Sequence, residues 1–218
     1  MIIPKNEREY RDLILTVANT EEPEDRHVRG YASTFNEPYL LFEDSDAQVW
    51  EKVDPAAFES TDMSDVIFQY DHEGRVFARV SNGTLTVAPD DHGLLIDADL
   101  GGTTIGRELY EEIRGGYTSK MSFGFTVPDD GSSWTNEPLE DGRRKVLRTI
   151  TRVGKLYDVS AVSLPANPNT AISVRTKEIC DGVIAEIAEE CRRAEAEEHR
   201  KAQREQLTRL LNEVKNHE

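Results

Sequence analysis

The sequence predicts an α+β fold: a mostly antiparallel β-barrel or sheet with packed helices, followed by a long C-terminal helix. As far as Thr176, short stretches rich in Val, Ile, Tyr, Phe, Leu and Thr alternate with turn residues, which is typical of strands. From Glu178 onward the apolar residues recur at helical spacing, with no Pro after Pro168 and no Gly after Gly182. The 218 residues therefore divide into a β-rich domain, residues 1–176, and a helical tail, residues 177–218.

The β-rich domain is expected to contain many strands interrupted by one helix. This helix begins after Thr103 or Thr104, whose hydroxyl would accept a hydrogen bond from the first turn, and ends at Gly115. Its apolar residues follow i, i+4, i+8 spacing, so they share one face. The expected strands are 28–35, 65–70, 75–80, 84–88, 94–100, 117–127, 145–153 and 156–164.

Two turn signals punctuate these strands. Asn82-Gly83 lies between two of them and predicts a tight type I′ hairpin, because both central residues of that turn need a positive φ. The polar stretch 129–144 is bracketed by two Asp-Gly pairs and predicts a mobile loop.

The helical tail has two interpretations. It carries an apolar stripe at its start and another after Gln206, with a polar section between them. One interpretation is one or two helices packed on the domain. The other is a protruding helix that self-associates or binds a partner, because the polar section offers too few apolar positions to bury.

Composition excludes several classes of function. With 26 Lys and Arg against 42 Asp and Glu, the formal net charge is −16, so a nucleic-acid partner is not expected. No apolar run approaches the roughly 20 residues of a membrane span, and no signal peptide is visible, so neither a membrane nor secretion is expected. Cys180 and Cys191 lie about 16 Å apart on a helix, too far for a disulfide, which favours reduced thiols in a cytosol.

The sequence lacks the familiar motifs for phosphate binding and for α/β-hydrolases, and its one acidic turn is a weak candidate for a metal site. The stretch 101–107 (GGTTIGR) has the glycine spacing of a phosphate loop but continues with Arg-Glu instead of Lys-Ser/Thr. The sequence has no Gly-x-Ser-x-Gly elbow. Asp90-Asp91-His92 reads as an exposed acidic turn, although a metal-dependent hydrolase built on it stays open as a hypothesis. We therefore predict no cofactor and no metal.

Three places remain for chemistry. His72 ends a strand just before a turn at Gly74, and imidazole is the commonest general base. In the strand 117–127, alternation puts Ser122 and Gly124 opposite the apolar face, where Ser122 would face solvent or a cleft and Gly124 would leave room for a substrate backbone. Asp158 lies inside a strand, where aspartate is disfavoured.

The order of these places resembles a known family. The matching blocks are Gly-Tyr-Ala-Ser-Thr-Phe-Asn (30–36), Asp-Pro-Ala-Ala-Phe (54–58), Asp-His-Glu-Gly-Arg (71–75), Gly-Leu (93–94), Met-Ser-Phe-Gly-Phe (121–125), and a closing block at 156–168 that ends in Pro-Ala-Asn-Pro. Together they resemble the prohead (capsid maturation) serine proteases of tailed bacteriophages, a family similar in fold to the herpesvirus assemblins. The resemblance covers about residues 29–174.

The resemblance implies a serine endopeptidase with Ser122 as nucleophile and His72 as general base. The family's third member is usually Glu, and Asp158, one methylene shorter, stands there in this chain. His92 and Asp71 are the alternatives for that role.

The implied substrates are the scaffold protein, or the scaffolding segment of the major capsid protein, and the protease itself, cut inside the prohead in the host cytoplasm. Self-association as a dimer or higher oligomer is expected, and the tail is expected to bind scaffold or to be removed by autocleavage. The alternative function is a catalytically silent assembly or scaffolding factor of the same fold.

Overall fold

The computed structural model describes residues 8–14, 26–163 and 174–215. The chain divides into two compact units, Met1–Thr176 and Lys177–Glu218. The first unit contains three β-sheets and the helix α1 (Thr104–Arg114). The described part of the second unit is helical and lies within the helix α2 (Val174–Lys215).

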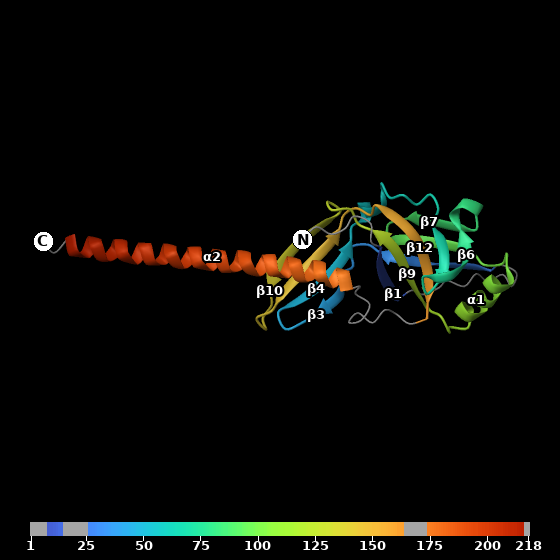
Figure 1. Ribbon diagram of the computed structural model, residues 1–218, viewed down its shortest axis with the longest axis horizontal. Coiled ribbons are helices and arrows are strands. Elements are labelled where there is room, and N and C mark those ends of the chain that lie inside the picture. Colours follow the sequence, from blue (N-terminus) through green and yellow to red (C-terminus); the bar gives the residue numbers. More distant parts are fainter. Residues whose placement is uncertain (1–7, 15–25, 164–173, 216–218) are drawn as a thin grey trace. The chain divides into compact units, whose positions relative to one another are not determined.

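Strands dominate the first unit (Figure 1). In spatial order, the five-stranded sheet consists of β1 (Glu9–Ile14), β9 (Lys120–Thr126), β12 (Lys155–Val162), β5 (Ile67–Tyr70) and β6 (Glu73–Arg79). The four-stranded sheet consists of β10 (Ser132–Pro138), β11 (Arg144–Ile150), β4 (Ala47–Val53) and β3 (Tyr39–Glu43). The three-stranded sheet consists of β2 (His27–Thr34), β8 (Gly93–Asp99) and β7 (Leu85–Pro89).

The expected α+β class with a mostly antiparallel sheet core is correct, but the expected barrel is not. Strand pairs are antiparallel except for β12 with β5 and β11 with β4. Within the described ranges no sheet closes on itself, and β1 and β6 are the two edges of the five-stranded sheet. β10 and β11, which follow β9 in sequence, pair in a different sheet, and no described strand pairs with both β6 and β1.

Two turn predictions are wrong. The stretch 129–144 is not simply a loop, because β10 lies within it and pairs with β11 along its whole length. Asn82-Gly83 does not close a two-residue hairpin, since β6 and β7 belong to different sheets. A short 3₁₀ turn, Val80–Asn82, connects them instead, and Gly83 ends it with φ of 78°.

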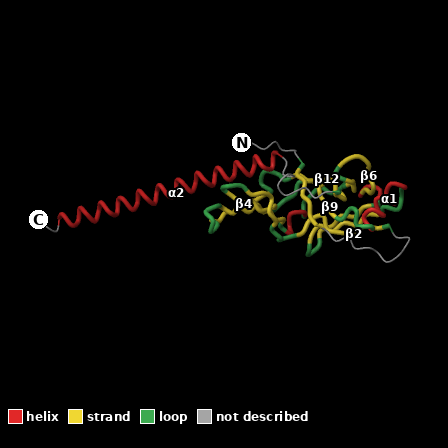
Figure 2. The backbone as a smooth tube through the Cα atoms, turned by 90° about the horizontal axis from the view of Figure 1, so that it is seen from below, coloured by secondary structure: helices red, strands yellow, loops and turns green. Residues whose placement is uncertain are grey.

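The helix α1 begins and ends as predicted. The Thr103 hydroxyl accepts a hydrogen bond from Gly106 N at 3.0 Å, and Gly115 follows the last turn. Its buried face includes Leu109 and Ile113, and the helix lies beside β6 in both views (Figures 1 and 2).

The helix α2 forms a continuous run of 42 residues, drawn in red in Figure 2. Charged side chains pair along its surface, for example Glu189 with Arg192 and Arg193. Among the residues that the structure describes, no helix is long and apolar enough to cross a membrane.

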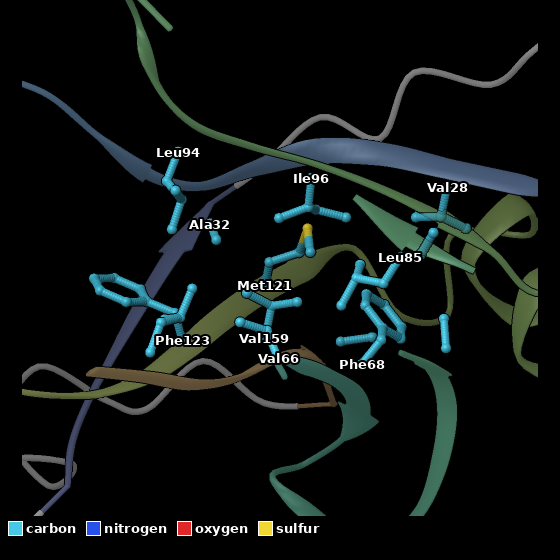
Figure 3. Packing of buried hydrophobic residues seen from close by; sticks show 14 of the residues in the cluster. Val28, Ala32, Val66, Phe68, Leu85, Leu94, Ile96, Met121, Phe123 and Val159 are labelled. Carbon is cyan, nitrogen blue, oxygen red and sulfur yellow. The ribbon is translucent and has the colours of Figure 1, made fainter. Parts of the chain in front are cut away.

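The core of the first unit is built from the inner faces of the five-stranded and three-stranded sheets. Figure 3 shows Met121, Phe123, Val159 and Phe68 from the first sheet facing Leu94, Ile96 and Val28 from the second, and all seven are buried. Because side chains alternate along a strand, residues 122, 124 and 158 point to the opposite face of the five-stranded sheet. The packing of the core therefore decides which side chains gather on the outer face.

Candidate active site

Ser122 lies at the centre of β9, between β1 and β12. Its Cα partners are Asp12 on β1 and Ser160 on β12. As predicted, Met121 and Phe123 point into the core and Ser122 points away from it. Of the two surroundings expected for Ser122, solvent or a cleft, exposure to solvent is wrong, because the residue has no exposed surface. Tyr117, the first residue of the expected strand 117–127, precedes β9 and is 84% exposed.

His72 lies in the tight turn between β5 and β6. Asp71 and His72 both adopt the left-handed conformation, with φ of 48° and 59°, which is costly for residues other than glycine. The Asp71 carboxylate accepts hydrogen bonds from Ser163 N and Ser163 Oγ, both at 2.8 Å, and Asp71 N donates to Ala161 O at 2.9 Å. These bonds join the turn to the end of β12 and so fix the direction in which His72 leaves the backbone.

Asp158 lies on β12, which runs between the strand of Ser122 and the strand that leads to His72. His72 Nδ1 lies 2.5 Å from Asp158 Oδ1, and His72 Nε2 lies 2.6 Å from Ser122 Oγ. Both hydrogen bonds are satisfied when Nδ1 carries the proton, so that Nε2 accepts from the Ser122 hydroxyl. Such a chain of a carboxylate, an imidazole and a hydroxyl is chemically able to activate the hydroxyl as a nucleophile.

Asp158 is 1% exposed, and a second partner holds it. Ser160 Oγ, two residues along β12 on the same face, donates to Asp158 Oδ1 at 3.0 Å. The other oxygen, Oδ2, lacks a hydrogen-bond partner among the described residues and points at Gly124. The sequence signal for Ser160 was its two-residue spacing from Asp158.

Gly124 is needed for a reason other than the predicted one. We expected its missing side chain to make room for a substrate backbone. A Cβ atom built at residue 124 would lie 2.4 Å from Asp158 Oδ2 and 2.7 Å from Tyr10 Cε1. The space over Gly124 is therefore occupied by the carboxylate of Asp158 and the ring of Tyr10.

Neither alternative acid or base contacts His72. The ring of His92 packs edge-on against Tyr31, with centroids 4.5 Å apart, on the three-stranded sheet. Asp71 uses both carboxylate oxygens on Ser163. Of the three candidates for the third position, the structure brings only Asp158 to the imidazole.

The acidic turn Asp90-Asp91-His92 has a structural use. Asp90 accepts hydrogen bonds from the backbone N–H groups of His92 and Gly93 and from the Tyr31 hydroxyl. Within the described ranges, no group of three or more His, Cys, Asp or Glu side chains is arranged to hold a metal ion.

Comparison with known families places these residues in context. The family model for the caudovirus prohead serine protease matches residues 15–182, a span that includes Ser122, His72 and Asp158. The chain belongs to this family. Searches of curated proteins and of solved structures found no match.

Family membership gives the chemistry its biological setting. Members are serine peptidases of the phage prohead, so the chain is a serine hydrolase of capsid maturation that associates with capsid proteins inside the prohead. The match begins at residue 15, so β1 lies ahead of it.

Proposed function

We propose that this prohead protease is a serine endopeptidase in which Ser122 is the nucleophile, His72 the general base and Asp158 the residue that orients the base. The observation that carries the proposal is the unbroken hydrogen-bond chain from Asp158 Oδ1 through both ring nitrogens of His72 to Ser122 Oγ. The three residues come from β12, the β5–β6 turn and β9, which are adjacent in one sheet.

The reaction is acyl transfer. Ser122 Oγ attacks the carbonyl carbon of the scissile peptide while its proton passes to His72 Nε2, and the same proton then goes to the leaving amine as the C–N bond breaks. Water, deprotonated by His72, hydrolyses the resulting ester and returns the proton to Ser122. Asp158 holds Nδ1–H in place and stabilises the imidazolium that forms in each half-reaction.

The substrates we propose are the scaffold protein, or the scaffolding segment of the major capsid protein, and the protease chain itself. A protease enclosed in a prohead meets these proteins at high local concentration. Like the assemblins, it is proposed to self-associate. We propose that α2, whose middle section is polar, is the segment that binds scaffold or is removed by autocleavage.

A catalytically silent assembly factor is the second candidate. The observation in its favour is that Ser122 has no exposed surface, so a peptide must displace covering atoms before it reaches Oγ. Co-expression with the neighbouring capsid and scaffold proteins separates the two candidates. We expect processing with the wild-type chain and none with Ser122→Ala.

The matched control is Ser33→Ala, which removes an equally buried serine hydroxyl from β2. Processing should continue with this variant. Unchanged processing with Ser122→Ala would refute the proposed nucleophile. An absence of processing with the wild-type chain, together with no labelling of Ser122 by a fluorophosphonate, would favour the silent assembly factor.

A further inference from the structure

The strand β1 lies outside the residues matched by the family model and yet borders the proposed nucleophile. It pairs with β9 in antiparallel register, with Asp12 opposite Ser122 and Tyr10 opposite Gly124. Residues directly opposite each other in an antiparallel pair project from the same face of the sheet. Tyr10 therefore projects from the face that carries Ser122 and Asp158.

The ring of Tyr10 lies against the ring of His72. The ring centroids are 4.4 Å apart and the planes are inclined by 59°. The edge of the same tyrosine ring covers the backbone at Gly124, as its 2.7 Å approach to a Cβ position there shows. Tyr10 thus contacts both the proposed general base and the strand of the proposed nucleophile.

We propose that Tyr10 is a positioning residue for His72, an inference that rests on the proposed function. The hydrogen bonds at Nδ1 and Nε2 fix the line through the two nitrogens but leave the imidazole free to tilt about that line. An aromatic ring packed on one side limits the tilt. Its π-electrons also attract the imidazolium that forms when the Ser122 proton moves to Nε2, because a cation over the face of an aromatic ring and within about 6 Å of its centroid is stabilised.

A buried charge cluster holds β1 in this position. We define it as Glu9 and Arg11 on β1, Glu51 on β4 and Arg148 on β11. Arg11 Nε donates to Glu51 Oε1 at 2.5 Å, and Arg148 donates to Glu9 at 2.6 and 2.9 Å and to Glu51 at 2.9 Å. Exposed fractions of these side chains range from 0% to 12%.

The charge cluster fixes the backbone on both sides of Tyr10. Glu9 and Arg11 alternate with Tyr10 along β1, so they point to the opposite face of the sheet. Each is bonded to a strand of the four-stranded sheet. The anchoring of β1 to that sheet therefore determines where the Tyr10 ring meets His72.

The test measures how fast a fluorophosphonate reacts with Ser122 in the full-length chain. In this reaction Ser122 Oγ bonds to phosphorus, fluoride leaves and His72 takes the hydroxyl proton. Tyr10→Leu should lower the limiting rate constant about 2- to 30-fold, the range expected for a cation–π contact, while the probe concentration for half-saturation stays unchanged. Tyr10→Phe, which keeps the ring, should stay within about twofold of the wild type.

Tyr31→Leu is the matched control. Tyr31 also packs its ring on a histidine, His92, but on the three-stranded sheet. Its removal should leave the rate constant unchanged. A wild-type rate for Tyr10→Leu, or an equal loss for Tyr10→Phe and Tyr10→Leu, would overturn the inference.

A second measurement does not depend on activity. In the Ser122→Ala background, Tyr10→Leu should shift the NMR signals of the His72 ring protons by removing the ring current of the tyrosine, and Tyr31→Leu should leave them in place. Unshifted signals would overturn the inference. If the fluorophosphonate labels Ser122→Ala as well as the wild type, the proposed function itself fails, and the two failures are thereby distinguished.

Discussion

Gly124→Ala provides a sharp test of the site because the new atom is a single methyl group. Its Cβ would lie 2.4 Å from Asp158 Oδ2, whereas ordinary van der Waals contacts begin near 3.4 Å. The carboxylate must therefore withdraw by about 1 Å or the strands must separate. Withdrawal on this scale stretches the 2.5 Å bond between Asp158 Oδ1 and His72 Nδ1 beyond hydrogen-bond range.

The expected loss of rate follows from that displacement. Misplacing a catalytic group by 1 Å costs about 10²-fold, which corresponds to about 2.7 kcal/mol in activation free energy. Overpacking also lowers the free energy of unfolding by about 1–3 kcal/mol. The rate of Ser122 labelling by a fluorophosphonate measures the first effect, and urea unfolding measures the second.

Gly102→Ala is the control for adding a methyl group. A Cβ at residue 102 would meet no atom within 4 Å, and Gly102 does not have a positive φ. We expect this variant to label and unfold like the wild type. Labelling of Gly124→Ala within about threefold of the wild-type rate would refute the packing of Asp158 against this glycine.

The partners of His72 and the charge cluster lead to three other expectations. Asp158→Asn should lower the rate of Ser122 labelling about 10⁴-fold, because an amide favours the wrong imidazole tautomer. Asp71→Ala removes both hydrogen bonds to Ser163 and should lower the free energy of unfolding by about 1–2 kcal/mol in urea. Burial alone would raise the pKa of Glu9, but the two arginines of the cluster outweigh it and lower that pKa to about 2. The ionised Glu9 should therefore contribute roughly 3 kcal/mol of stability above pH about 4.5, lost as the pH falls towards about 2.

Each of these expectations has its own control. Asp158→Asn should leave the urea midpoint close to that of the wild type, and labelling within tenfold of the wild-type rate would contradict the proposed role. Asp71→Asn keeps one oxygen that accepts from Ser163 N, so it should lose less stability than Asp71→Ala. Glu9→Gln should flatten the pH dependence of stability in the acid window, and a wild-type slope in that variant would contradict the assigned pKa.

The strand of the proposed nucleophile was predictable because β9 lies between two other strands and has one face in the core. Alternation then separates Met121, Phe123 and Phe125 from Ser122 by residue type alone. The chemistry of Ser122, His72 and Asp158 marks each as a candidate, but their catalytic roles come from a different route, the resemblance to a family. Periodicity could not have paired His72 with Asp158, since they are 86 residues apart in sequence.

The strand β1 was not predicted, for a physical reason. Its residues include Glu9 and Arg11, which favour an exposed segment when only composition is considered. Arg11 is buried and the Glu9 side chain is only 12% exposed, because partners 40 and 139 residues away neutralise their charges. The interpretation of Gly124 was wrong for the same reason: the atoms that fill the space above it come from β1 and β12, which are far from it in sequence.

The wide spacing of the proposed triad also has a consequence for the folding of the chain. The hydrogen bonds of His72 span 50 residues to Ser122 and 86 residues to Asp158. Contacts of such long range form late and slowly, because closing each loop costs conformational entropy before the contact can form. A nascent or partly folded chain that lacks β12 therefore cannot hold the imidazole in line, and we expect newly made chains to stay inert until the five-stranded sheet is complete.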